Sequence, residues 1–252
     1  MANNIKYFIG NWKMFGVPNS INILKKINNF IKTDKNAQKY KVIIAPPYTL
    51  LQFFSNFLKK KKIKLAGQNC FHKDPFSSNT GGVSPFMLRN LGCEFVIVGH
   101  SDNRKEGDND KIIKEKIKYA LKNNLHVILC IGESLKEKNK NQTFAVLKKQ
   151  INNSLEKKFN YKKILIAYEP IWSIGTGKIQ SYENLLKTTL FIKKTSKNIF
   201  KTKKTIPVLY GGSVERKNIK KFKLLNEIDG FLIGGASRSF KNFIDIIKNY
   251  YR

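Results

Sequence analysis

Glu169 is the residue best placed for acid–base chemistry in this 252-residue chain. It directly follows the apolar run ILIAY and precedes Pro170, so its carboxylate is expected at the rim of a packed core. Partial burial would raise the pKa of this carboxyl group and suit it to abstracting a proton. Taken alone, a glutamate at this position is more often a solvated or ion-paired surface residue.

His100 is the second candidate, because it also follows an apolar run, FVIVG. Ser101 is expected to cap a helical turn behind it, and a helix N-terminus favours a neutral imidazole. Such a ring would donate a hydrogen bond to a substrate carbonyl. The other two histidines are predicted to be structural, since His72 falls in a loop and His126 begins a strand at the opposite end.

Lys13 and Asn11 lie just beyond the first apolar run, where the ammonium group would face a developing oxyanion. The chain has 43 lysines, so residue type alone says little about Lys13. A Schiff base is the rival chemical role. Barrel aldolases, however, normally carry their lysine within a later strand, and no late apolar run here has an interior lysine.

Glycine pairs follow the last two apolar runs, at residues 211–212 and 234–235. Turns of this kind expose backbone N–H groups, and two of them at neighbouring strand ends predict a phosphate site. Residues 170–178, PIWSIGTGK, combine hinge-like glycines with Trp172 and Ile174, which need somewhere to be buried. A lid that closes over substrate would bury them and exclude water, although an ordinary connector is the alternative.

These residues must be positioned by eight short apolar runs that alternate with amphipathic stretches. Near-continuous apolar strands separated by helices indicate a parallel sheet covered by helices, and eight units in this length favour a single closed (β/α)8 barrel domain over residues 1–252. The predicted strands are 6–10, 42–45, 63–66, 95–99, 126–130, 164–168, 207–210 and 230–233; predicted helices include 20–31, 110–122, 143–155, 182–195 and 218–225.

The formal net charge is +31, yet only five of the 48 basic residues are arginine. Because the lysines are spread along the whole chain, we predict a solvated cationic surface and no specific nucleic-acid site. The lysines at 59–62 are expected to end a helix. The chain shows no apolar run long enough to span a membrane and no secretory signal, and its three scattered cysteines suggest neither a disulfide framework nor a zinc site. A cytoplasmic protein is therefore expected.

The chain resembles the triosephosphate isomerase family in a set of motifs that run in the family's order from the first strand to the last. AYEPIWSIGTGK at residues 167–178 is the most specific of them. The others are GNWKM at 10–14, IVGHS at 97–101, ILCIGE at 128–133, LYGGSV at 209–214 and IGGAS at 233–237.

This resemblance implies a cytoplasmic, homodimeric TIM-barrel isomerase of glycolysis and gluconeogenesis, with no cofactor and no metal. It would interconvert dihydroxyacetone phosphate and D-glyceraldehyde 3-phosphate through an enediolate. By the same resemblance Glu169 is the base and His100 the neutral electrophile, with Asn11 and Lys13 completing the pocket. The remaining implied residues are Gly175, Ser213, Gly234 and Gly235 at the phosphate; Pro170, Ile171, Trp172, Ser173, Ile174, Gly175, Thr176, Gly177 and Lys178 in the lid; and Tyr210, Ser213 and Glu133 as its supports.

Three positions depart from the family pattern. Asp102 and Asn103 follow the histidine where the family has glutamate and arginine, and Gly82 replaces the glutamate of the third loop. Both halves of a charged contact near the subunit interface are therefore missing, which bears on the stability of the dimer, although no orphaned charge is left.

Two hypotheses compete with an isomerase. One is a polyanion-binding protein on a barrel scaffold that has lost its enzymatic activity (the retired-barrel hypothesis), and the other is a different phosphate-binding barrel enzyme.

Overall fold

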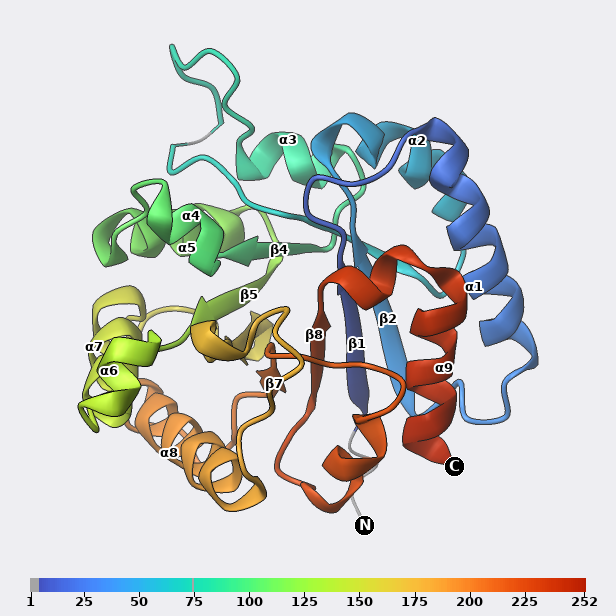
Figure 1. Ribbon diagram of the computed structural model, residues 1–252. Helices are drawn as coiled ribbons and strands as arrows, with labels where there is room; N and C mark the ends of the chain where they lie inside the picture. Colours follow the sequence, from blue (N-terminus) through green and yellow to red (C-terminus); the bar gives the residue numbers. More distant parts are fainter. Residues whose placement is uncertain (1–4, 74) are drawn as a thin grey trace.

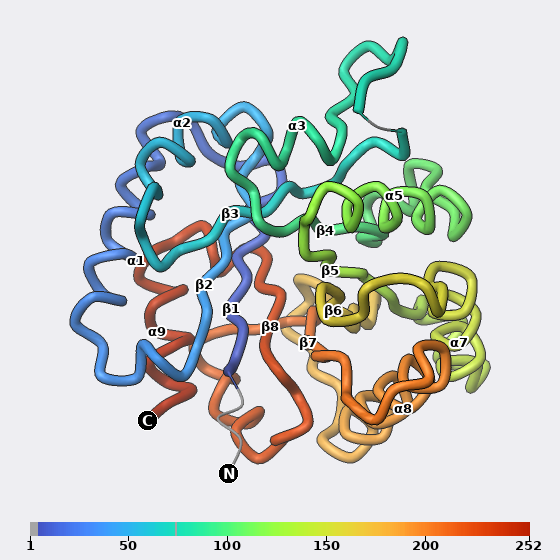
Figure 2. The backbone as a smooth tube through the Cα atoms, turned by 180° about the vertical axis from the view of Figure 1, so that it is seen from behind, coloured from blue at the N-terminus to red at the C-terminus, as the bar shows by residue number. Residues whose placement is uncertain are grey.

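Eight parallel strands form a closed barrel at the centre of the computed structural model, which describes residues 5–73 and 75–252. Each strand pairs with the next, and the first closes the ring against the last. Figure 2 shows them following one another around the ring, with the helices outside. The strands are β1 (Lys6–Asn11), β2 (Tyr40–Ala45), β3 (Lys64–Gly67), β4 (Phe95–Val98), β5 (His126–Ile131), β6 (Ile164–Tyr168), β7 (Val208–Tyr210) and β8 (Gly230–Ile233).

All eight strands predicted from the apolar runs are confirmed, with ends displaced by two residues at most. The runs are almost continuously apolar because both faces of each strand are buried. Side chains such as Ile9, Ile97 and Leu209 fill the barrel interior. Alternate side chains, including Phe8 and Val98, pack outward against the helices.

The helices run between the strands and cover the outside of the barrel (Figure 1). They are α1 (Ile21–Thr33), α2 (Tyr48–Leu58), α3 (Pro85–Asn90), α4 (Ser101–Lys105), α5 (Asp110–Lys122), α6 (Leu135–Asn139), α7 (Thr143–Ser154), α8 (Tyr182–Phe200) and α9 (Phe240–Tyr251). The predicted helix at 218–225 is wrong in type, since Ile219–Leu224 forms a 3-10 helix. Its buried residues Ile219 and Phe222, and the buried C-cap Leu225 that follows, are three apart, which matches three residues per turn.

One long segment leaves the body of the molecule. Between β3 and α3 the chain projects outward beyond the barrel, as both backbone views show (Figures 1 and 2). The three cysteines, Cys70, Cys93 and Cys130, are buried and form no disulfide. Within residues 5–73 and 75–252, no helix has the length and apolar character needed to cross a membrane.

Candidate active site

A cavity of about 360 Å³ lies at the carboxyl ends of the strands and brings the predicted residues together. Asn11, Lys13, His100 and Glu169 line one side of it. Its remaining lining includes the predicted phosphate residues Gly175, Ser213, Gly234 and Gly235, together with Ile174 of the predicted lid. The carboxyl ends are where barrel enzymes carry their chemistry, so this is the candidate active site.

Glu169 continues the line of β6 into the cavity. Its backbone N–H donates to the carbonyl of Ile131 at 2.7 Å, which extends the sheet by one residue and fixes where the side chain starts. The residue is only 3 % exposed, and burial raises the pKa of its carboxyl group, as the sequence predicted. Gly211 leaves room for the side chain, because a Cβ there would lie 2.8 Å from the Glu169 Cγ.

The His100 ring is oriented through its two nitrogens. The backbone N–H of Asp102 donates to His100 Nδ1 at 3.1 Å, which makes Nδ1 the acceptor nitrogen of the ring. Nε2 then carries the hydrogen, and it lies 3.2 Å from Oε1 of Glu169. The expectation that Ser101 caps the helix is wrong: His100 itself is the N-cap of α4, because its ring nitrogen reaches the free N–H of Asp102. Ser101 instead offers its N–H to Glu169 Oε2 at 3.4 Å.

Lys13 adopts a left-handed backbone conformation, with φ of 56°, that side-chain-bearing residues seldom take. Such a conformation costs about 1–2 kcal/mol and persists only where neighbours impose it. Here the Asn11 Oδ1 accepts from the Lys13 N–H at 3.1 Å, and Gln68 Nε2 donates to the Lys13 carbonyl at 2.9 Å. Gln68 also donates to the carbonyl of Ala45 at 2.8 Å, which ties the turn to the end of β2.

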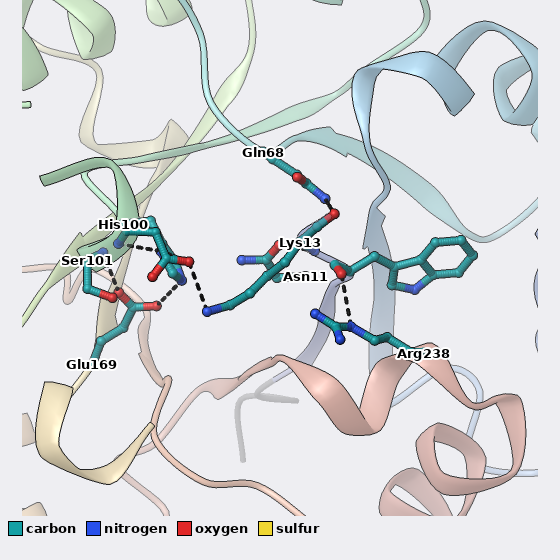
Figure 3. A network of polar contacts seen from close by, with 9 residues as sticks. Asn11, Lys13, Gln68, His100, Ser101, Glu169 and Arg238 are labelled. Atoms are coloured by element: carbon teal, nitrogen blue, oxygen red, sulfur yellow. Dashed lines mark hydrogen bonds and ion pairs between the residues drawn. The ribbon is translucent and has the colours of Figure 1, made fainter. Parts of the chain in front are cut away.

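The Lys13 side chain extends toward His100 (Figure 3), and its ammonium pairs with Asp102, with 3.0 Å between Nζ and Oδ2. Although partial burial opposes it, this contact with Lys13 lowers the pKa of Asp102. The shorter side chain at this position therefore still pairs with the lysine.

Sequence reasoning missed Gln68 and Arg238. Arg238 lines the cavity and donates from Nε to the Trp12 carbonyl at 3.0 Å, which joins the end of β8 to the end of β1. Arginine is rare in this lysine-rich chain, and a lone arginine just after the last strand was the available signal for it. Gln68 had no comparable signal, because its partners lie 55 and 23 residues away.

The predicted phosphate end of the cavity has open backbone. At Gly234 and Gly235 an added Cβ would meet no atom within 4 Å, so the main chain there faces empty space. Gly235 begins a short 3-10 helix (Gly235–Arg238), and barrels commonly bind phosphate at such a helix after their last strand. The Ser213 N–H currently donates to Ser173 Oγ at 3.3 Å.

The first half of the predicted lid is held by hydrogen bonds, whereas its second half is exposed to solvent. Trp172 donates to the buried carboxylate of Glu133 at 2.8 Å, and Tyr168 donates to the same oxygen at 3.1 Å. Ser173 Oγ lies 3.2 Å from the Tyr210 hydroxyl. The residues that follow, 175–178, are exposed, with Gly175 and Gly177 both at positive φ. Glu133 and Tyr210 thus sit beneath the lid rather than in the cavity.

The raised pKa of Glu169 predicts a pH-dependent cost in stability. Its carboxyl group binds a proton more tightly in the folded protein than at its ordinary pKa of 4.5 in the unfolded chain. The stability of the wild type should therefore fall as pH rises from about 4.5 through the folded-state pKa. Glu169→Gln has no carboxyl group to titrate at this position. Its urea midpoint, compared with that of the wild type, should therefore rise over that pH window and then stay a constant amount higher. Urea unfolding of both proteins at several pH values tests this, and an advantage that shrinks would contradict it.

Within the described part of the chain, no three His, Cys, Asp or Glu side chains gather as a metal site would require. The cavity gathers the buried carboxylate of Glu169, an imidazole donor, an amide and the cations Lys13 and Arg238, with Glu215 as a second carboxylate in its lining. Together with the closed barrel and the open glycine turns, they define a (β/α)8-barrel enzyme that moves protons on a phosphorylated substrate.

The chain belongs to the triosephosphate isomerase family, whose sequence pattern matches residues 6–250. It is 38 % identical over 244 residues to the triosephosphate isomerase of Geotalea uraniireducens (strain Rf4), covering 95 % of this chain and 96 % of that one. It is also 38 % identical over 256 residues to that of Dictyostelium discoideum, covering 99 % and 98 %. The crystal structure of triosephosphate isomerase from Bartonella henselae superposes with a TM-score of 0.89 at 32 % identity, covering 98 % of this chain and 99 % of that one.

Membership of this family makes the chain an aldose–ketose isomerase of glycolysis that interconverts dihydroxyacetone phosphate and D-glyceraldehyde 3-phosphate. The expectation drawn from the motifs is confirmed at the level of family and fold.

Proposed function

We propose that Glu169 is the base that moves the proton between C1 and C2 of the substrate, with His100 as the electrophile and Lys13 as the cation facing the oxyanion. The observation that carries this assignment is the hydrogen bond from the Asp102 N–H to His100 Nδ1, because it leaves Nε2–H as a donor pointed into the cavity beside Glu169. A neutral donor beside a buried carboxylate suits a proton abstraction next to a carbonyl.

The reaction runs in two proton transfers. The Glu169 carboxylate takes a proton from C1 of dihydroxyacetone phosphate while His100 Nε2–H donates to the C2 oxygen, and the electron pair of the C–H bond becomes part of the enediolate. Lys13 offsets the negative charge on the oxygens. Protonated Glu169 then returns the proton to C2, while a proton passes from the C1 oxygen to the C2 oxygen through His100. Because His100 Nε2 lies 3.2 Å from Glu169 here, that contact must break when substrate enters.

For the phosphate we propose the backbone N–H groups of Gly175, Ser213, Gly234 and Gly235. The open space at Gly234 and Gly235 supports this, since a ligand can approach the main chain there. The Ser213 N–H is engaged with Ser173 of the lid, so phosphate binding at Ser213 and movement of the lid would be coupled. Closure would place Ile174 over the substrate and exclude water from the enediolate.

A coupled isomerase assay on the purified chain tests the activity directly, with molecular mass measured in solution on the same sample. Turnover at a rate typical of an enzyme is expected; its absence, with tight binding of polyanions, would instead support the retired-barrel hypothesis. Three buried cysteines outside any disulfide fit a reducing compartment, which supports the proposed cytoplasmic location.

The charge of the whole protein predicts a salt effect on substrate capture. A dianionic triose phosphate approaching a chain of net charge +31 should be steered to it, and such steering weakens as salt shortens the Debye length to about 3 Å at 1 M. We expect kcat/KM to fall as salt rises while kcat changes less. Steady-state kinetics across a salt series tests this, and a series with an uncharged solute of matched viscosity is the control. If kcat/KM does not change with salt, the electrostatic field of the pocket itself, and not the charge of the whole protein, governs substrate capture.

We also propose a homodimer in which the projecting segment 71–87 enters a partner copy. Phe76 on this segment is 72 % exposed, and Met14, next to the catalytic lysine, is 98 % exposed. Phe76 also contacts the 37 % exposed Phe86, with ring centroids 5.5 Å apart, and contiguous exposed apolar surface of this kind marks interaction sites. A cavity of about 240 Å³ beside Met14, lined also by Lys13 and Asn103, would receive the partner's segment.

Dimerisation should strengthen when salt is added. Gly82 and Asn103 supply no ion pair for salt to screen, whereas two copies of a +31 chain repel each other and screening reduces that repulsion. Sedimentation equilibrium over ranges of protein and salt concentration, with activity measured in parallel, checks this. A dimer that loosens in salt, or a monomer with full activity, would refute the proposed interface.

A further inference from the structure

A second cavity, of about 590 Å³, opens at the amino ends of the strands, across the barrel from the active site. Its inner lining comes from the first residues of several strands, including Tyr7, Lys41, Lys64, Phe95 and His126. None of these residues takes part in the proposed chemistry. The volume exceeds that of the active-site cavity and falls within the range of small-molecule sites.

The floor of this cavity is apolar and contains flat rings. Tyr7 packs against the side chains that fill the barrel interior. The His126 imidazole stacks on Phe95, with ring centroids 4.8 Å apart and planes inclined by 26°. Phe95 is only 4 % exposed, whereas His126 is partly exposed, so the imidazole is the ring of the pair that a ligand in the cavity can reach. A partly exposed imidazole beside a cavity can serve as a stacking platform for the flat ring of a ligand.

His126 does not add charge to this floor. Burial lowers the pKa of its imidazole, and the nearby ammonium groups of Lys163 and Lys41 lower it further. Its Nδ1 is buried without a hydrogen-bond partner. A neutral ring suits stacking better than a hydrated cation would, because removing a neutral ring from water costs less free energy.

The rim, in contrast, is strongly cationic. Six lysines line the cavity: Lys41, Lys60, Lys61, Lys62, Lys64 and Lys162. The one acidic residue in the lining, Glu94, is already paired with Lys64 at 2.6 Å. Within the described residues no carboxylate forms an ion pair with the other five lysines.

Three of these cations come from one turn. The prediction that residues 59–62 end a helix is only partly right, since α2 ends at Leu58, Lys59 is its C-cap and the other three lysines follow it. The turn then passes through Lys60 at φ 61° and sets Lys60, Lys61 and Lys62 at the same cavity mouth. The Lys61 ammonium donates to the Phe57 carbonyl of α2. Like charges on neighbouring residues of one turn repel, and an anion bound among them would relieve the repulsion.

We propose that this cavity binds a nucleoside polyphosphate, with its base stacked over His126 and its phosphates among the lysines. Both halves of the cavity are then used: an inorganic anion would leave the apolar floor empty, and an uncharged aromatic molecule would leave the lysines unpaired. A mouth bounded by residues of six strands encloses a single ligand better than a continuous nucleic-acid strand.

Isothermal titration of the full chain tests this proposal, with ATP as the probe and with adenosine and tripolyphosphate as its two halves. ATP should bind more tightly than either half. The double variant Lys41→Gln/Lys62→Gln should weaken ATP binding by about 10-fold or more, the scale of one lost hydrogen bond to a charged group. The matched control Lys148→Gln/Lys149→Gln removes the same charge from the exposed face of α7 and should weaken it far less.

Three outcomes would overturn the proposal. The first is tripolyphosphate binding as tightly as ATP, which would make the stacking platform irrelevant. The second is an equal loss in both double variants, which would assign binding to diffuse charge and favour a polyanion such as an oligonucleotide. The third is loss of ATP binding in Lys13→Met, which would place the nucleotide in the active site. Because the cavity residues are outside the catalytic set, isomerase activity should survive in both double variants and serves as the check on folding.

Discussion

Glu169→Asp should lower kcat by about 10²-fold. The substitution withdraws the carboxylate by about one bond length, and misplacement of a reacting group by about 1 Å can cost that much. Glu169 has little freedom to compensate, because its N–H is fixed to Ile131 at 2.7 Å and the side chain is 3 % exposed. Glu169→Gln, which has no base at all, should lose more, within the ~10²–10⁴-fold range of general base catalysis.

Glu215→Asp is the matched control for this prediction, because Glu215 lines the same cavity but has no role in the proposed proton transfer. Its kcat should stay close to the wild-type value. Steady-state kinetics in both directions of the reaction, with KM determined for each variant, separates the chemical step from binding. Near-normal turnover of Glu169→Asp would remove Glu169 from the mechanism.

Lys13→Met should reduce kcat/KM by about 10²–10³-fold, which is the cost of removing one preorganised group that stabilises an oxyanion. Methionine keeps an unbranched apolar stem and removes only the charge. The backbone of Lys13 is held by Asn11 and Gln68, whose hydrogen bonds go to main-chain atoms and do not depend on the side chain. The variant should therefore fold, and Asp102 loses its partner without being buried, since its side chain is 50 % exposed.

Lys148→Met is the control, because it removes one of the same 43 lysines from the exposed surface of α7. If charge acts only through the summed field, the two variants should behave alike; if position decides, only Lys13→Met should be impaired. The salt dependence of kcat/KM should persist in Lys13→Met, since the remaining charge still steers the substrate. Equal activity in the two variants would exclude a special role for Lys13.

Several features could be predicted from the order of residues alone. Parallel strands buried on both faces must be apolar throughout, so the eight runs were visible in the sequence. The position of Glu169, His100 and Lys13 just past such runs then placed them at one end of the barrel, and all three line the same cavity. Their individual catalytic roles, in contrast, were drawn from the resemblance to the family. The type of the segment Ile219–Leu224 was misjudged because spacings of three and four residues are hard to separate in a short stretch.

Other properties were decided only by tertiary structure, because they depend on groups that the chain brings together over long separations. The strained turn at Lys13 is held by Gln68, 55 residues away, and the end of β1 is tied to Arg238, 226 residues away from Trp12. Even the local contact that fixes the tautomer of His100 requires the angle at which α4 leaves β4, which no residue pattern specifies. The sequence thus determined which side chains reach each end of the barrel, whereas packing decided the partners, protonation and cavities they form there.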